Sequence, residues 1–172
     1  MNPKEAAAKY SLNQLSSKDI YRIADQWLVD GIFTDSINEI SMEREPIFSV
    51  VGVLFENALE ELGHCIPSRV EAAKYLIKVT LTRMVEEEID LMEGANYIYW
   101  ELHHSVTDVL PDIEHVGSNL GLGAIFCWLR EIWDCRDGSM ILYYVDLPRE
   151  KAEAKFLEHL REESIKWLEK NA

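Results

Sequence analysis

The sequence has little cysteine and no long apolar run. Its three cysteines, Cys65, Cys127 and Cys135, are odd in number and follow no zinc-binding or redox spacing. The longest apolar run, "MILYYV", is far shorter than the roughly 20 residues that cross a bilayer as a helix. The first residues lack the basic start and apolar core of a secretion signal. We therefore predict a cytoplasmic protein without a membrane partner, whose cysteines are buried packing residues.

Positive charge is scarce, and it is missing from the middle of the chain. The 172 residues carry a formal net charge of −14. No lysine or arginine occurs between Arg83 and Arg130, where the acids are Glu86, Glu87, Glu88, Asp90, Glu93, Glu101, Asp108, Asp112 and Glu114. A field of this sign repels nucleic acid and anionic membranes and attracts cationic proteins. We expect a basic protein partner and no nucleic acid; the alternative interpretation is that the charge serves solubility alone.

Catalytic signatures are also absent. The stretch "GSNLGLGA" contains closely spaced glycines, but it lacks the preceding strand and the full spacing of a phosphate-binding loop. No nucleophile elbow occurs. Ser105 follows His104 directly, and adjacent side chains on a helix do not face each other. The sequence therefore predicts a protein that is not an enzyme and needs no cofactor.

Apolar residues recur at helical spacing along almost the whole chain. The clearest predicted helix covers residues 68–93, where Ser68 and Glu71 form a capping box and Gly94 supplies the end. The segment "MILYYVDL" predicts a short strand or an extended connector near residues 140–146. We predict an all-α protein in which residues 1–172 form a single bundle-like domain of about six or seven helices.

Acids and histidines gather in the stretch "WELHHSVTDVLPDIEH". Glu101, His104 and Asp108 have the i, i+3, i+7 spacing of one helical face, and His115 follows in a loop. Histidine and carboxylate side chains are suitable zinc ligands. A metal-dependent helical enzyme that uses these residues is therefore an alternative to the non-enzymatic prediction.

A protein-docking face is the other interpretation of the same stretch. If residues 97–109 form a regular helix, Ile98, Leu102, Val106 and Val109 face the core. The predicted outward face then comprises Tyr97, Trp100, Glu101, His104 and Asp108, extended by Asp112, Glu114, Glu86, Glu87 and Glu88. Aromatic anchors among acids are typical of binding hot spots for basic partners. The competing interpretation is that Trp100 packs under the C-terminal helix. The other tryptophans, Trp133 among them, are predicted to be packing residues.

Size, acidity and helical class together resemble the immunity proteins of bacterial polymorphic-toxin and contact-dependent-inhibition systems. The resemblance covers the whole chain and is carried by no specific motif, so it assigns no residue a role. It implies a stoichiometric inhibitor that binds a cognate, often basic, toxin domain. A helical adaptor or regulator with another partner is the remaining alternative.

Overall fold

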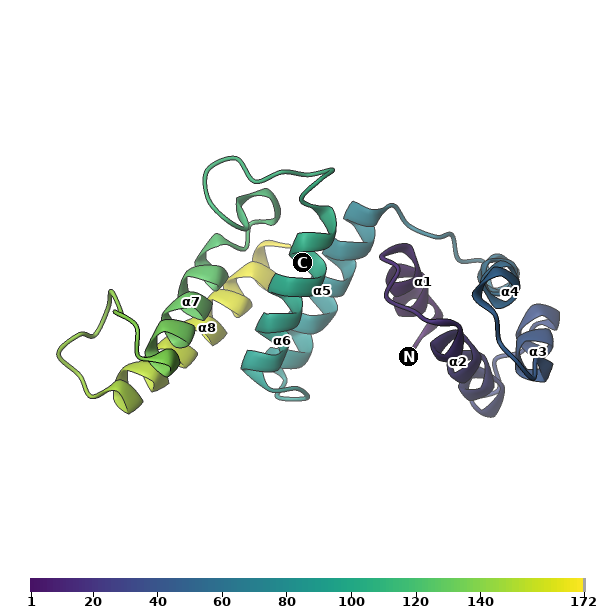
Figure 1. Cartoon of the computed structure of the whole chain (residues 1–172), viewed down its shortest axis with the longest axis horizontal. Helices are drawn as coiled ribbons and strands as arrows, with labels where there is room; N and C mark the ends of the chain where they lie inside the picture. Colours follow the sequence, from purple (N-terminus) through teal and green to yellow (C-terminus); the bar gives the residue numbers. More distant parts are fainter. Residues whose placement is uncertain (172) are drawn as a thin grey trace. The chain divides into compact units, whose positions relative to one another are not determined.

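The computed structural model describes residues 1–171, which form helices and loops without a β-strand (Figure 1). This confirms the predicted all-α class. The α-helices in these residues are α1 (Pro3–Ser11), α2 (Ser17–Val29), α3 (Asp35–Met42), α4 (Phe48–Glu61), α5 (Arg69–Val85), α6 (Leu91–Tyr97), α7 (Gly123–Asp137) and α8 (Arg149–Lys170). The shorter elements are the π-helix η1 (Ile98–His103) and the 3₁₀ turns η2 (His104–Val106) and η3 (Ser118–Leu120).

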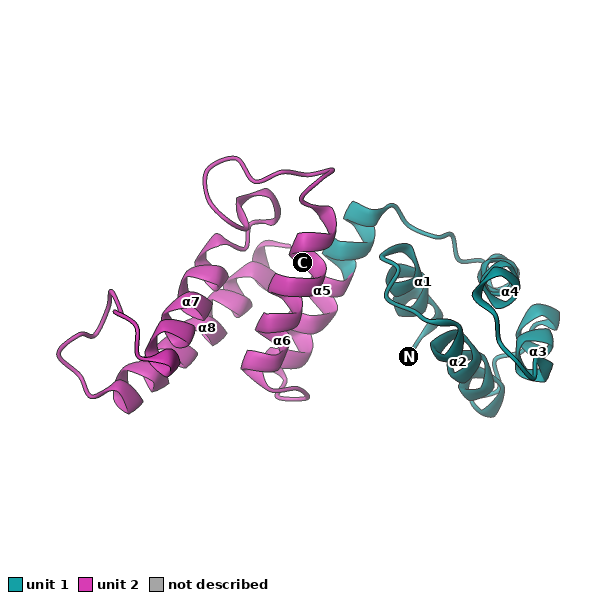
Figure 2. Cartoon of the chain, in the orientation of Figure 1, with its two compact units in different colours: residues 1–75 teal, residues 76–172 magenta. Residues whose placement is uncertain are grey.

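The chain divides into two compact units (Figure 2). Unit 1 comprises residues 1–75, and unit 2 begins at Leu76, so the boundary falls inside α5. That residues 1–172 form a single domain stays a prediction. No helix within residues 1–171 has both the length and the apolar character needed to cross a membrane.

Unit 1 is built around two stacked aromatic rings. Trp27 of α2 and Phe55 of α4 are both buried, with ring centroids 5.7 Å apart and 13° between the planes. The indole N–H of Trp27 donates a hydrogen bond to the carbonyl of Met1 (2.9 Å), so this buried donor is satisfied. Helices α2, α3 and α4 pack against one another around this pair. The rings therefore form the centre of one continuous apolar core.

Helix α1 is the element that the periodicity did not indicate. Asn2 caps it by accepting a hydrogen bond from the Glu5 amide (2.8 Å). Its buried residues are Glu5, Ala6, Ala7 and Ala8. Alanines favour helices but add no large apolar side chains to the periodic pattern. The helix count is for this reason one above the expected range.

The predicted helix over residues 68–93 is wrong, because the chain turns after Val85. Glu87 adopts the left-handed conformation (φ 60°), and Asp90 starts α6 by accepting hydrogen bonds from the amides of Met92 (2.8 Å) and Glu93 (3.0 Å). Arg161 of α8 stabilises the turn by donating to the exposed carbonyl of Val85 at the end of α5 (2.8 Å).

Gly94 lies inside α6 and is buried, so the prediction that it ends a helix is also wrong. A Cβ at this position would lie 2.4 Å from Cγ of Met84 in α5. Glycine is therefore required because α5 and α6 approach closely here. The sequence pattern could not distinguish this role from that of a helix cap.

Helices α7 and α8 pack against each other and are joined by a loop over residues 138–148 (Figure 1). The guanidinium of Arg149 holds the loop by donating to the carbonyls of Cys135 (2.9 Å), Gly138 (3.0 Å) and Ser139 (2.7 Å). Residues 140–146 form no strand, which corrects the strand alternative. Tyr144 has φ of 55°, so the segment is a turned connector.

All three cysteines are free, and only Cys135 is buried. Cys65 in the connector before α5 and Cys127 in α7 are exposed. The prediction of buried packing residues is therefore correct for Cys135 alone. Burial depends on where each residue lies on its element, which the spacing between cysteines does not report.

Candidate protein-binding face

A π-helical turn sets the direction of the candidate binding residues in unit 2. The regular helix predicted over residues 97–109 is replaced by the end of α6, by η1 and by η2. Ile98, Leu102 and Val106 are buried, as predicted. Val109 is 53% exposed, so its assignment to the core is wrong. The reason is that the helical segment ends at Val106 and Val109 lies in the turn that follows it.

Trp100 is held between two rings although it is exposed. Its side chain is 57% exposed, which excludes the interpretation that it packs under the C-terminal helix. Its ring stacks on His104 (centroids 5.3 Å apart, 22° between planes) and on Trp133 of α7 (6.0 Å, 26°). Tyr99 completes the group with an edge contact to Trp100 at 4.7 Å. We call Tyr99, Trp100, Glu101, His104 and Trp133 the Trp100 face.

Hydrogen bonds fix the rings on both sides of Trp100. The indole N–H of Trp133 donates to Oδ1 of Asn96 in α6 (3.1 Å). Nδ1–H of His104 donates to the carbonyl of Tyr99 (2.6 Å). Because both neighbours are anchored, Trp100 is restricted to one arrangement before any partner arrives. Such preorganisation lowers the entropy lost on binding.

The structure does not assemble the alternative metal site. Within residues 1–171, no three histidine, cysteine, aspartate or glutamate side chains lie together in a way that could hold a metal ion. His104 is turned toward the Tyr99 carbonyl instead. His115 lies against Gly123, where an added Cβ would be 2.1 Å from its Nε2. Glu101, His104, Asp108 and His115 are therefore not brought together as a ligand set.

Asp112 is directed inward, toward a buried histidine. Its Oδ2 lies 2.9 Å from Nε2 of His103, which is 2% exposed, and its Oδ1 accepts a hydrogen bond from the Asn119 amide (3.3 Å). Burial, the largest influence, acts to raise the pKa of Asp112, but the amides of Asn119 and Gly117 and the His103 ring outweigh it and lower that pKa. Asp112 thus organises the loop rather than the outer face.

The other predicted residues lie at the surface with differing surroundings. Glu86, Glu87 and Glu88 are exposed at the turn between α5 and α6. Two of their charges are offset, because Glu87 pairs with Arg161 (2.5 Å) and Glu88 with Arg83 (3.9 Å). Arg161 of α8 therefore offsets part of the negative charge in the stretch that contains no lysine or arginine.

The remaining four predicted residues of this stretch are at least partly accessible to solvent. Glu114 and Asp108 are exposed, and Tyr97 is half-buried. Glu101 is exposed beside Trp100 and forms no ion pair or hydrogen bond within residues 1–171. Its carboxylate is therefore the charge on the Trp100 face most open to a cationic partner.

A small cavity of about 380 Å³ adjoins the Trp100 face. Its lining includes Tyr99, His115, Phe126, Cys127, Arg130 and Trp133. Although Cys127 is exposed, partial burial of its thiol, reinforced by the charge of Glu131, raises the pKa of that thiol. Arg130 lies 3.8 Å from Asp134, so the one cation of the lining is paired. Trp133 and Arg130 were not among the predicted site residues, because they lie on α7, which packs against α6 only in the folded protein. Tyr99, the sequence neighbour of Trp100, was also not among them.

A scan against models of known protein families, a search of curated proteins and a search of solved structures each returned no match. The functional argument therefore depends on the geometry of the face itself.

Proposed function

We propose that this chain is an acidic protein-binding protein of the immunity type, which neutralises a basic toxin domain by stoichiometric binding through the Trp100 face. The observation that carries the proposal is Trp100, which is 57% exposed and yet stacked on both His104 and Trp133. Tryptophan is the residue most typical of binding hot spots, and a rigid one loses little entropy when it is covered.

The charge of the chain supports a cationic partner. A net charge of −14 accelerates association with basic proteins and disfavours nucleic acid and anionic lipid. At the face itself, Glu101 is available for a lysine or arginine of the partner, beside the exposed Trp100 side chain. The carboxylate that attracts a basic partner and the tryptophan that the partner covers therefore lie next to each other on the Trp100 face.

The proposal includes a cytoplasmic location and no enzymatic activity. Three free cysteines are consistent with a reducing compartment. The function then requires only that the face covers the active site of the toxin or blocks access to it. A helical adaptor with a non-toxic basic partner uses the same face, and the identity of the bound partner separates the two functions.

The decisive experiment uses the toxic C-terminal domain of a secreted protein encoded beside the gene for this chain. Co-expression is expected to restore growth, and surface plasmon resonance is expected to show binding that weakens between about 0.1 M and about 1 M NaCl, as screening increases. Trp100→Ala and Glu101→Lys should each impair growth rescue and binding.

Met140→Ala is the matched control, because Met140 is 80% exposed on the α7–α8 loop and is not part of the Trp100 face. It should behave as the wild type. Binding that ignores both Trp100→Ala and Glu101→Lys would reject the face. Failure of the wild-type chain to bind or protect would reject the immunity function, and a basic non-toxic partner would favour the adaptor.

A further inference from the structure

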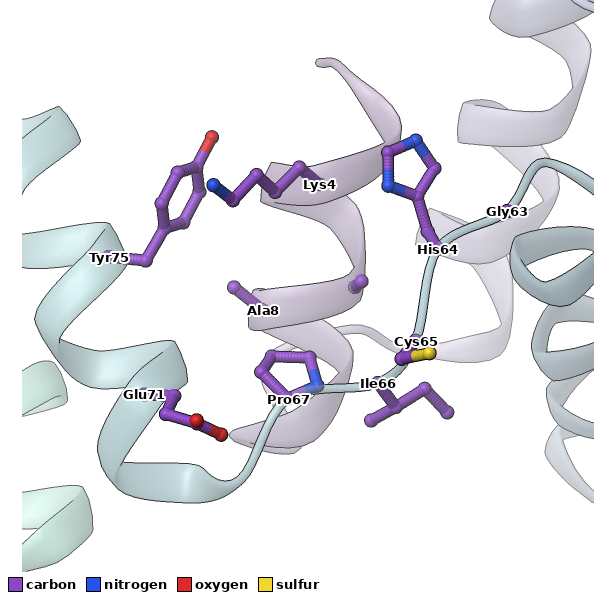
Figure 3. Close-up of a pocket in the computed structure, with 10 residues that line it drawn as sticks. Lys4, Ala8, Gly63, His64, Cys65, Ile66, Pro67, Glu71 and Tyr75 are labelled. Atoms are coloured by element: carbon purple, nitrogen blue, oxygen red, sulfur yellow. The ribbon is translucent and has the colours of Figure 1, made fainter.

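Unit 1 contains a cleft of about 500 Å³ that the Trp100 face does not involve (Figure 3). It lies between α1, the connector before α5 and the first turns of α5. Its lining includes Lys4, Ala8, His64, Ile66, Pro67 and Tyr75. Sites for small molecules usually measure about 300 to 1,000 Å³ and are mainly apolar with a few polar groups. The cleft has the size and composition of such a site.

The walls of the cleft are fixed by backbone hydrogen bonds. Gly63 adopts φ of 75°, and the amides of Gly63 and His64 each donate to a carbonyl in the last turn of α4 at 2.8 Å. The hydroxyl of Ser11 at the end of α1 donates to the carbonyl of Pro67 (2.8 Å). The connector is therefore tied to α4 and to α1, and the cleft is preformed.

Two nitrogen-bearing side chains line the cleft without a polar partner. Nζ of Lys4 lies 4.7 Å from the centroid of the Tyr75 ring. Neither this ammonium nor the imidazole of His64 forms a hydrogen bond or ion pair within the described part of the chain. The ammonium of Lys4 lies at the wall of the cleft with no carboxylate partner in residues 1–171. Its position favours an anionic group from outside the chain.

The one carboxylate of the lining is already engaged. Oε2 of Glu71 accepts hydrogen bonds from the amide (2.9 Å) and the hydroxyl (2.6 Å) of Ser68, in the capping box that begins α5. These bonds, the one from the hydroxyl first, lower the pKa of Glu71, so it stays ionised. In the view of Figure 3, Glu71 lies toward one end of the cleft, and Lys4 and His64 lie toward the other.

We propose that this cleft binds a small monocarboxylate with an apolar body. The carboxylate lies at the Lys4 ammonium, and the body packs on Ala8, Pro67 and the Tyr75 ring. Apolar contact and one charge-assisted hydrogen bond then act together. A ligand with a second negative charge at its far end would meet the Glu71 carboxylate, which disfavours dianions and nucleotides.

Phenylacetate is a suitable probe, with phenylacetamide as its neutral counterpart and 2-phenylethylamine as its cationic one. In ¹H–¹⁵N correlation spectra of the full chain, phenylacetate should shift the amides of α1, of residues 63–66 and of the start of α5. We expect phenylacetate to bind about tenfold more tightly than phenylacetamide, which corresponds to one charge-assisted contact, and the amine to bind most weakly.

Lys4→Gln should reduce phenylacetate affinity to that of the amide, whereas Lys4→Arg should retain most of it. Lys18→Gln on α2 removes one positive charge away from the cleft and is the matched control. Equal affinity for the acid and the amide, an unchanged affinity in Lys4→Gln, or shifts confined to other residues would each overturn the proposal. Its outcome is independent of the Trp100 face, because every cleft residue belongs to unit 1.

Discussion

The indole of Trp100 lies nearly parallel to the indole of Trp133, with 6.0 Å between the ring centroids. The first ring is largely exposed, while the second is half-buried and hydrogen-bonded to Asn96. The two tryptophans therefore have different roles: Trp133 supports the face from below, and Trp100 presents it to solvent. This difference can be tested without a partner.

We predict that Trp100→Ala changes the free energy of unfolding by less than about 1 kcal/mol, as is usual for exposed side chains. Trp133→Ala should cost about 2 kcal/mol or more, because it removes packing and leaves Asn96 without its indole donor. Urea unfolding followed by circular dichroism measures both. A larger loss for Trp100→Ala than for Trp133→Ala would contradict this division of roles.

The lowered pKa of Asp112 predicts a loss of stability in acid. The hydrogen bonds to Asp112 outweigh its burial, so the folded state binds this proton less readily than the unfolded state, where the pKa is about 3.9. The stabilisation is complete above that value and is lost as the pH falls through the lower folded pKa. Asp112→Asn should therefore be less stable than the wild type at neutral pH, and the difference should shrink in acid.

Urea midpoints of the two proteins between neutral and strongly acidic pH check this prediction. Glu114→Gln is the control, because Glu114 is an exposed acid in the same loop. A constant difference between the wild type and Asp112→Asn across the pH range would show that the charge of Asp112 does not contribute.

Gly94→Ala should destabilise the protein although alanine favours helices over glycine by about 1 kcal/mol. The new methyl group would lie 2.4 Å from Cγ of the fully buried Met84 and 3.0 Å from Cδ1 of Ile89. Overpacking of this kind costs about 1–3 kcal/mol. The double variant Gly94→Ala/Met84→Ala should lose less than the sum of the single changes, because Met84→Ala vacates the space. Thermal unfolding of the four proteins tests this, and a stabilised Gly94→Ala protein would contradict it.

Tyr10 should titrate at unusually high pH. Burial, followed by the hydrogen bond from its hydroxyl to Oε1 of Glu56 (2.7 Å) and the charge of Glu56, raises the pKa of Tyr10 to about 12. The folded state therefore keeps this proton after the unfolded state has lost it, and the stabilisation present below about pH 10 disappears as the pH rises toward the folded value. Tyrosinate absorbance measures the titration.

Glu56→Gln should lower the pKa of Tyr10, since it removes the charge and weakens the hydrogen bond. Glu60→Gln, one turn further along α4, is the control and should leave the titration unchanged. Tyr10→Phe should remove the component that titrates at the highest pH. If that component survives, it belongs to another tyrosine.

Much of the fold follows from local patterns. Ser16 and Ser68 are followed three residues later by Asp19 and Glu71, and both capping arrangements are present where α2 and α5 begin. The turn after Val85 was not predictable, because its acids and apolar residues continue a helical pattern. A left-handed Glu87 and the hydrogen bond from Arg161 replace that pattern, and both depend on α8.

Only the exposed residues of the candidate site could be predicted from the sequence. The burial of Ile98 and Leu102 follows from apolar spacing, and this places Trp100 and Glu101 on the outside. The inward direction of Asp112 depends on its contacts with His103 and Asn119 in the folded loop, and the position of Trp133 beside Trp100 depends on packing between segments far apart in the chain. No spacing within a single sequence reports such contacts.

The π-turn of η1 has a consequence for how related chains diverge. A π-turn holds one more residue than an α-helical turn, and each residue of an α-helix turns the following side chains by about 100°. Removing one residue from Ile98–His103 would restore regular winding and redirect the side chains that follow, while each could keep its identity. A change in chain length, rather than a series of substitutions, is therefore a short evolutionary route to a different surface in this part of the molecule.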